Sequence, residues 1–245
     1  MTSKARHSVG IACAGLFAFA TALGIGRFGY TPILPFMMHD LGLTKAQGGL
    51  IGSASLLGYL VGAIGTSKAK LPGGMKLWTF AGVAGSVVTT ACLGLGTSMA
   101  WLLTIRFISG ICSSIVLVFG TAMILDALAN RGRMDLAGIH FSGLGVGIVV
   151  SAVVVSGCAA LGFDWAGLWL ASGVVSLAGF ALVIWLAPES ADIPPKMPSG
   201  IKSTPEPGVA SYIAAYGLVG FGYVITATFI SAMARLSPEL RPLEP

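Results

Sequence analysis

The sequence predicts an all-α membrane protein with seven transmembrane helices, and three observations support this prediction. The 245 residues are 55% hydrophobic and only 9% charged, with a mean hydropathy of +0.89. Seven apolar runs are long enough to cross a bilayer, and the basic residues gather on alternate connections between them. A water-soluble domain needs roughly a quarter of charged residues to cover its surface, so lipid must cover much of this chain.

Each predicted span is an apolar run of about 20 residues or more, the length that crosses a hydrocarbon core about 30 Å thick. In chain order the runs are Val9–Met37, Ala46–Thr66, Leu77–Thr97, Met99–Leu125, Leu136–Gly162, Trp165–Leu186 and Val209–Met233. Together they contain no Asp or Glu, and their only Lys or Arg residues are Arg27 and Arg106.

The first run also resembles a cleavable signal peptide. Lys4 and Arg6 precede an apolar stretch that contains Ala20-Thr21-Ala22, a small-residue pattern typical of a cleavage site. The apolar character, however, continues past Arg27 to Pro35, well beyond the core of a signal peptide. We therefore expect this run to be retained as the first span.

The distribution of Lys and Arg predicts a multi-pass protein of the plasma (inner) membrane with a cytoplasmic N-terminus. In this orientation three basic residues in the connections and tail lie outside, namely Lys45, Arg235 and Arg241. The nine on the cytoplasmic side are Lys4, Arg6, Lys68, Lys70, Lys76, Arg131, Arg133, Lys196 and Lys202.

The connections between the apolar runs predict that the chain has three parts. Very short outer turns, Ser98 and Phe163-Asp164, make spans three and four, and spans five and six, antiparallel neighbours. The stretch Ala187–Gly208 contains six prolines and is predicted to be a linker. We therefore expect a six-helix bundle over residues 1–187, a proline-rich cytoplasmic linker over 188–208, and a further helix with a tail over 209–245.

Several classes of function find no support in the sequence. The net charge of +5 is spread over the connections instead of forming one patch, which argues against a nucleic-acid partner. All four cysteines lie in apolar runs without a CxxC pair or a Cys/His cluster, so we expect no metal site and no cofactor.

The string Gly24-Ile-Gly26-Arg27-Phe28-Gly29 matches the dinucleotide-binding pattern, but it lies within a membrane helix instead of following a strand. The spans also contain no Gly-x-Ser-Gly string and no pair of carboxylates. We therefore do not expect an enzyme.

The two arginines within the spans are the main candidates for a functional site. An arginine at the centre of a membrane helix costs about 2.5–3.5 kcal/mol and needs a compensating environment. By helical rise, Arg27 and Arg106 both lie about 10–12 Å below the outer ends of their spans. The polar and aromatic residues that accompany them on the same helix faces are Tyr30, Thr31, Ser109 and Ser113.

Two interpretations of these arginines remain open. In the first, Arg27 and Arg106 share a cavity and hold an anion, such as the carboxylate of a substrate. In the second, Arg106 binds only backbone carbonyls and serines, while Arg27 extends toward the outer interface.

His140 is a candidate for proton coupling, because histidine titrates near neutral pH. It lies about one turn inside the cytoplasmic end of the fifth run. The alternative is an interfacial histidine that bonds to a neighbouring helix. Asp126 is interpreted as a solvated boundary charge or a partner of Arg131.

Small residues at regular spacing predict close helix packing in two of the spans. They are Gly48, Gly52, Gly58 and Gly62 in the second run and Gly143 and Gly147 in the fifth. One interpretation is packing within the six-helix bundle. The other is that some of these glycines form faces for helices outside it, supplied by a missing second bundle or by self-association.

Several strings resemble one family of transporters. Leu102-x-x-x-Arg106-x-x-Ser109-Gly110 resembles the fourth-helix motif of the major facilitator superfamily (MFS). Strings similar to its YbfB/YjiJ-like branch lie at residues 24–32, 58–60, 138–143 and 216–223. The resemblance implies an MFS N-terminal bundle in which helices one and four line a central cavity. It also implies transport of a small organic solute by alternating access between two bundles.

This sequence departs from the superfamily pattern at two points. Thr66 stands where the loop motif between helices two and three carries an Asp, and seven predicted spans are fewer than the family's twelve. The sequence therefore predicts secondary active or facilitative transport by a truncated chain whose partners are the lipid bilayer and a small molecule. The alternative is a non-transporting membrane protein, a remnant that acts only as an interaction partner.

Overall fold

The structure, a computed structural model, describes residues 3–68 and 72–187 together with a few positions between 208 and 222. Contacts divide the chain into two units, Met1–Ile193 and Pro194–Pro245, and each is described by itself. The described residues form helices and no strand, so the predicted all-α fold is confirmed. Most of the predicted seventh span, Val209–Met233, and of the predicted linker lies outside the described residues.

Six helical segments in the described part are long and apolar enough to cross a membrane. They coincide, within a few residues at most ends, with the first six predicted runs. Span one consists of α1 (Ser3–Phe19), the π-helix η1 (Ala20–Ile25) and α2 (Tyr30–Leu41), span two is α3 (Lys45–Lys68), and span three is α4 (Gly74–Leu93). Span four consists of α5 (Met99–Ile115), the π-helix η2 (Val116–Gly120) and α6 (Thr121–Ala129). Span five consists of the 3-10 turn η3 (Met134–Leu136) and α7 (Ala137–Ala160), and span six is α8 (Trp165–Leu186).

Three helices that begin at the same end of the bundle have side-chain caps, which explains why their short turns suffice. Before α3, the Thr44 hydroxyl accepts from the backbone N–H of Gln47, and the Gln47 side chain accepts from the N–H of Thr44. The Ser98 hydroxyl caps α5, and the Asp164 carboxylate caps α8. Each cap satisfies backbone N–H groups that a helix start leaves without partners.

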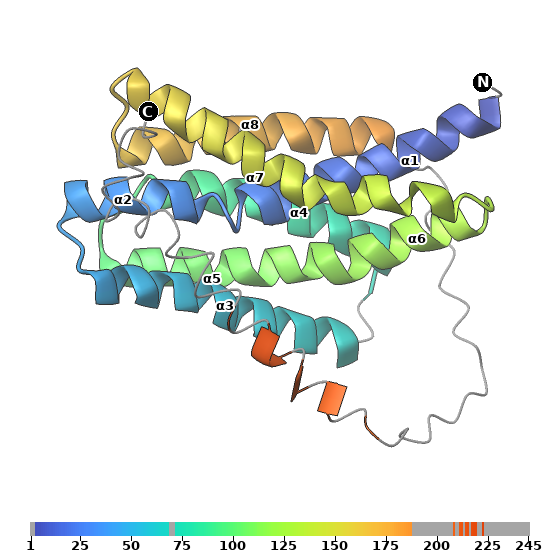
Figure 1. Cartoon of the computed structure of the whole chain (residues 1–245), viewed down its shortest axis with the longest axis horizontal. Coiled ribbons are helices and arrows are strands. Elements are labelled where there is room, and N and C mark those ends of the chain that lie inside the picture. Colours follow the sequence, from blue (N-terminus) through green and yellow to red (C-terminus); the bar gives the residue numbers. More distant parts are fainter. Residues whose placement is uncertain are drawn as a thin grey trace. The chain divides into compact units, whose positions relative to one another are not determined.

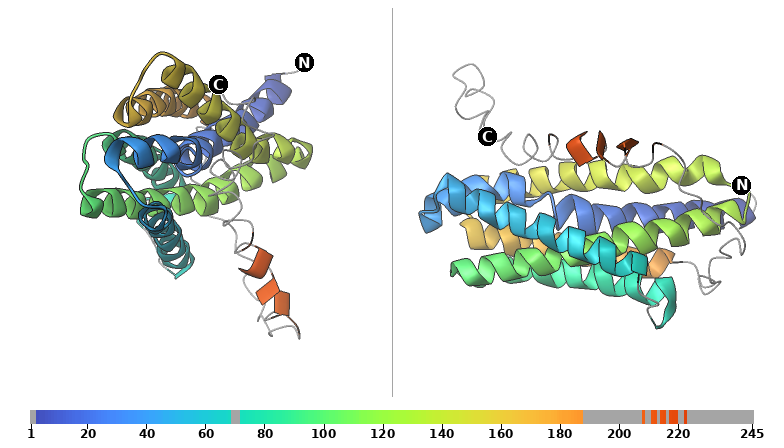
Figure 2. Two further views of the ribbon diagram at one scale, coloured as in Figure 1. Left: turned by 60° about the vertical axis from the view of Figure 1, so that its left-hand side comes forward. Right: turned by 90° about the horizontal axis from the view of Figure 1, so that it is seen from below.

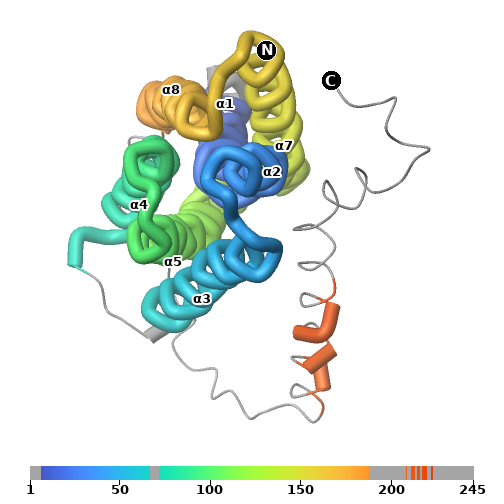
Figure 3. Tube along the Cα trace, turned by 90° about the vertical axis from the view of Figure 1, so that its left-hand side faces the viewer, coloured from blue at the N-terminus to red at the C-terminus, as the bar shows by residue number. Residues whose placement is uncertain are grey.

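Within the first unit the six spans lie side by side, as Figures 1 and 2 show from three directions. Viewed along the helices, span one runs through the middle of the bundle (Figure 3). It packs against α7 and α8 through α1, and against α4 through η1. In contrast, α3 packs mainly along α5 and is covered little by other helices. The bundle is therefore built around its first span.

The helix contacts repeat with a shift of three spans. Span two packs on span four as span five packs on span one, and span three packs on span four as span six packs on span one. Both spans one and four contain a π-helix near the middle. The described bundle is thus two similar three-span halves, and spans one and four are equivalent positions within them.

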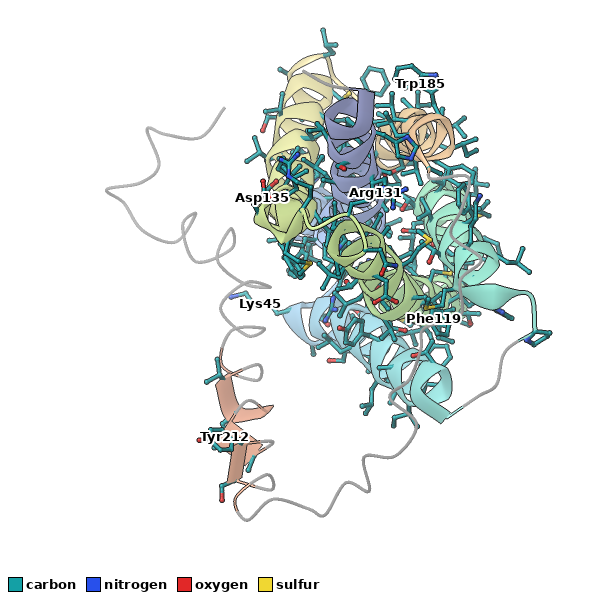
Figure 4. All side chains as sticks on the ribbon, turned by 90° about the vertical axis from the view of Figure 1, so that its right-hand side faces the viewer. Lys45, Phe119, Arg131, Asp135, Trp185 and Tyr212 are labelled. Atoms are coloured by element: carbon teal, nitrogen blue, oxygen red, sulfur yellow. The ribbon has the colours of Figure 1, made fainter. Side chains whose placement is uncertain are left out.

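Several charged residues lie at one end of the bundle. The turn between α6 and α7 carries an ion pair between Arg133 and Asp135 at 2.8 Å, and Arg131 donates to the carbonyl of Ala127. Figure 4 shows Arg131 and Asp135 at the end of the bundle nearest the viewer. Asp126 is exposed, as one of its two predicted roles requires.

Candidate functional site

Span one is interrupted at Arg27. The π-helix η1 ends at Ile25, residues 26–29 form a turn, and α2 begins at Tyr30. Two backbone bonds in this turn reach back five residues, from Gly26 to Thr21 and from Phe28 to Leu23. Further on, Pro32 has no N–H with which to continue the regular ladder. The interruption takes the carbonyls of residues 26 and 27 out of the regular helical pattern.

Arg106 of α5 binds these carbonyls. Its Nη1 donates to the carbonyl oxygen of Gly26 at 3.1 Å, and its Nη2 donates to that of Arg27 at 3.2 Å. The Ser109 hydroxyl also donates to Gly26, at 3.4 Å. The guanidinium lies over the ring of Tyr30, 4.7 Å from its centre, and the residue is only 2% exposed. The end of this guanidinium is therefore occupied by the backbone of span one.

The guanidinium of Arg27 lies on a different surface, between spans one and two. It sits over the ring of Tyr59, 4.2 Å from the ring centre, and 5.6 Å from that of Phe28. Arg27 and Tyr59 are both half-buried. Tyr59 was not predicted as a site residue, although it lies in the string at residues 58–60. A single aromatic residue in an apolar run carries no signal of such a contact.

The other predicted site residues divide into two groups. Tyr30 belongs to the arginine site, and its hydroxyl donates to the carbonyl of Gly48 at 2.7 Å. Thr31 lies in the first turn of α2 and is half-buried. Ser113, in contrast, donates to the carbonyl of Gly110 in its own helix, 2.9 Å away, and reaches no residue of span one through that bond.

Two buried polar atoms on the facing surfaces of α3 and α5 have no hydrogen-bond partner among the described residues. They are Oγ of Ser55 and Nε of Arg106. Ser55 lies one turn before Tyr59, and a Cβ at Gly110 would overlap the carbonyl oxygen of Ser55 and meet the N–H of Tyr59 at 2.7 Å. Buried polar groups without partners are uncommon, so these two atoms mark the surface between α3 and α5 as a candidate binding region.

Most of the predicted packing glycines meet partners inside the bundle. A Cβ at Gly58 or Gly62 would overlap atoms of α5, and one at Gly143 or Gly147 would overlap the backbone of span one. Gly48 packs on Leu34, and Gly52 lies half-buried on α3. For these four glycines the contacts favour the first interpretation, packing within the six-helix bundle.

His140 is buried away from the arginines. Its Nε2 lies 3.3 Å from the hydroxyl of Thr121 in α6, its ring contacts Phe19, and its Nδ1 packs against Gly15 of α1. The adjoining cavity has room for about one water molecule. The residue therefore joins spans one, four and five in the interior, whereas its predicted alternative role was at the membrane interface. In the described part of the chain no three His, Cys, Asp or Glu residues form a group that could hold a metal.

Comparisons with known proteins match this chain to transporters. The family model described as "Uncharacterised MFS-type transporter YbfB" matches residues 19–239. The gallate transporter of Pseudomonas putida is 29% identical over 164 residues, which cover 65% of this chain and 35% of that transporter. The 4-hydroxybenzoate transporter PcaK of Pseudomonas aeruginosa is 26% identical over 176 residues, covering 72% of this chain and 39% of PcaK.

The PcaK protein of Acinetobacter baylyi is 26% identical over 194 residues, or 77% of this chain and 40% of that protein. This chain thus spans less than half the length of the curated transporters it resembles.

Proposed function

We propose that this chain, which belongs to the YbfB-like family of MFS-type transporters, supplies one six-helix bundle of a transporter for a small organic anion. The family match confirms the resemblance seen in the motifs, and it places the chain among transporters instead of enzymes. The relatives are named for gallate and 4-hydroxybenzoate, which are both aromatic carboxylates. Such an acid is the substrate class we propose here.

The observation that carries this proposal is the pair of arginines at the interruption of span one, Arg27 in that span and Arg106 on α5. The six described spans contain no Asp or Glu in their apolar runs, so a positive region in the bundle favours an anionic ligand. In our proposal the substrate carboxylate binds the guanidinium of Arg27. Arg106 adds a second positive charge while it holds the backbone of the interruption, with Ser109, Tyr30 and Thr31 around it.

The transport mechanism we propose is alternating access. A single bundle cannot enclose a substrate from both sides, so the described helices would work opposite a second bundle and rock against it around the site. The N-terminus is proposed to lie in the cytoplasm of a cell with this protein in its inner membrane, following the basic residues of the connections. His140 has a packing role in this proposal, because its contacts lie away from the arginines.

The proposal is tested by measuring binding and uptake separately. The purified 245-residue chain in lipid nanodiscs is expected to bind 4-hydroxybenzoate, and Arg27→Gln is expected to reduce this binding at least tenfold, since it removes a charge-assisted hydrogen bond. Absence of saturable binding by the unchanged chain would refute the anion site.

The competing function, a membrane protein that does not transport, makes a different prediction for uptake. We expect proteoliposomes with the 245-residue chain alone to show no uptake, and we expect uptake when the chain is covalently followed by a second six-helix bundle from a relative such as the gallate transporter. Binding without uptake in both preparations would favour the non-transporting alternative. Saturable uptake by the 245 residues alone would refute the need for a second bundle.

A further inference from the structure

We propose that Arg106 and Ser55 form a binding site for a small inorganic anion, of the size of chloride, at the contact between α5 and α3. The site is separate from the guanidinium of Arg27, and it holds whichever solute the protein carries. It assigns a ligand to two buried polar atoms that have no hydrogen-bond partner among the described residues.

The guanidinium of Arg106 carries a buried charge whose hydrogen-bond acceptors in the described residues are neutral. Two of its nitrogens donate to the carbonyls of residues 26 and 27, and its face lies over the ring of Tyr30. The residue is 2% exposed, and the apolar runs of the six described spans contain no Asp or Glu. A buried charge is costly without a partner of opposite charge, and these runs do not supply one. An anion from solution fits this need.

Two donors remain available for such an anion. The Nη atoms of Arg106 bind span one, whereas its Nε is buried and has no partner in the described part of the chain. The hydroxyl of Ser55, on the facing surface of α3, is also buried and without a described partner. Guanidinium Nε–H is a donor, and a hydroxyl donates or accepts as its surroundings require. Hydrogen bonds in which donor and acceptor are charged are the stronger ones.

Gly110 shows that the two donors belong to one tight helix contact. It follows Arg106 by about one turn of α5, and a Cβ at Gly110 would overlap the carbonyl oxygen of Ser55. The backbones are equally close at Gly58, where a Cβ would overlap the carbonyl of Phe107. Backbones this close exclude an aromatic ring from the contact. The ligand we propose is therefore a single small ion and not the aromatic acid proposed as substrate.

Water and chloride differ in what they do for the charge. A water molecule gives Nε an acceptor, but it leaves the charge of the guanidinium uncompensated. A monovalent anion accepts from both donors and also neutralises the charge. The attraction between opposite charges grows as the surrounding dielectric constant falls, so the interior of a membrane bundle favours the anion.

The first test measures the thermal stability of the 245-residue chain against halide concentration. The purified chain in lipid nanodiscs is unfolded in potassium gluconate, which is replaced stepwise by potassium chloride at constant ionic strength. A ligand that binds only the folded state stabilises it by mass action. We expect the midpoint of unfolding to rise by about 4 °C at a chloride concentration about ten times the dissociation constant.

Ser55→Ala removes one of the two donors. It is expected to weaken chloride binding about tenfold, which raises the chloride concentration that gives half of the stabilisation. Ser176→Ala is the matched control, because the Ser176 hydroxyl is also buried without a described partner but lies on α8, which packs mainly on α4 and α1. This control should keep the chloride dependence of the unchanged chain. If Ser55→Ala keeps it too, or if both variants lose it equally, the site is refuted.

A second measurement needs no variant. Crystals of the unchanged chain, grown from a lipidic mesophase with bromide in place of chloride, are expected to show an anomalous-scattering peak beside Nε of Arg106 and Oγ of Ser55. Density for water without an anomalous signal would overturn the proposal, as would a midpoint of unfolding that does not respond to chloride. Neither experiment contains 4-hydroxybenzoate, so a failure of this site leaves the proposed transport function to its own test.

Discussion

Spans one and four are equivalent positions in the two halves of the bundle, yet they are built differently. Each contains one arginine within its predicted apolar run, and each contains one π-helix. Span four continues without interruption from α5 through η2 to α6, whereas span one stops at Ile25 and begins again at Tyr30. The sequence helps to explain the difference, because Pro32 has no N–H for the carbonyl of Phe28, at the end of the interruption, and span four contains no proline.

The difference shows how the two halves of a structural repeat can take different roles. One half supplies the site, and the other half supplies the residues that hold the site in place. The interrupted span offers backbone carbonyls in the interior of the bundle, and the continuous span offers the donors that satisfy them. Arg106 can hold two carbonyls because α5 is a regular helix that fixes its position. An unsatisfied carbonyl in a membrane interior costs several kcal/mol, so the two spans depend on one another.

The largest effect on stability is expected from replacing Arg106, which donates to the carbonyls of residues 26 and 27. Arg106→Gln leaves at least one of the carbonyls of residues 26 and 27 without its partner, and we expect a loss of about 3 kcal/mol in the free energy of unfolding. Arg106→Lys, which keeps a charge and one strong donor, should lose less. Unfolding by SDS in mixed micelles measures both. Equal stability of Arg106→Gln and the unchanged chain would show that the interruption does not need this arginine.

A smaller effect is expected from separating the helices that carry the site. A side chain at Gly110 would overlap the Ser55 carbonyl, so Gly110→Val should destabilise the bundle by about 2 kcal/mol through overpacking. The control is Gly145→Val, since a Cβ at Gly145 meets nothing within 4 Å. The same SDS titration applies to both. If the two variants lost equal stability, the close approach of α3 and α5 would not be the cause.

The third prediction tests whether the interruption itself creates the need for Arg106. Pro32→Ala restores an N–H and allows a more regular helix through this point. In that background Arg106→Gln should cost less than in the unchanged chain, with a coupling of about 1 kcal/mol in a double-mutant cycle. Additive effects of the two substitutions would mean that Arg106 supports span one in some way unrelated to the proline.

The sequence predicted the spans well because membrane helices are selected by one strong signal, a long apolar run. It also singled out Arg27 and Arg106, since a charge within such a run is costly and needs a reason. The interruption of span one was not predicted, although the residues responsible for it are visible. A run that is apolar throughout, as Val9–Met37 nearly is, gives no sign in its hydropathy of where its backbone bonds change.

Contacts between spans were harder to predict than the spans themselves. Glycine spacing identified packing faces on the second and fifth runs, but spacing does not say which helix lies opposite. The structure places Gly58 on α5 and Gly147 on span one. Likewise Tyr59 looks like any other aromatic residue in an apolar run, and its importance follows only from the position of Arg27 above its ring.

The smallest effect on stability is expected from replacing Arg27, and this result would separate the roles of the two spans most clearly. Arg27 contributes its carbonyl to the contact with Arg106, and Gln at this position supplies the same carbonyl. The side chain loses its contacts with Tyr59 and Phe28, which are worth about 0.5–1 kcal/mol at a half-buried site. Arg27→Gln should therefore lower the free energy of unfolding by no more than about 1 kcal/mol while it reduces binding of 4-hydroxybenzoate at least tenfold. A loss as large as that of Arg106→Gln would instead show that the interrupted and the continuous span use their arginines in the same way, for stability.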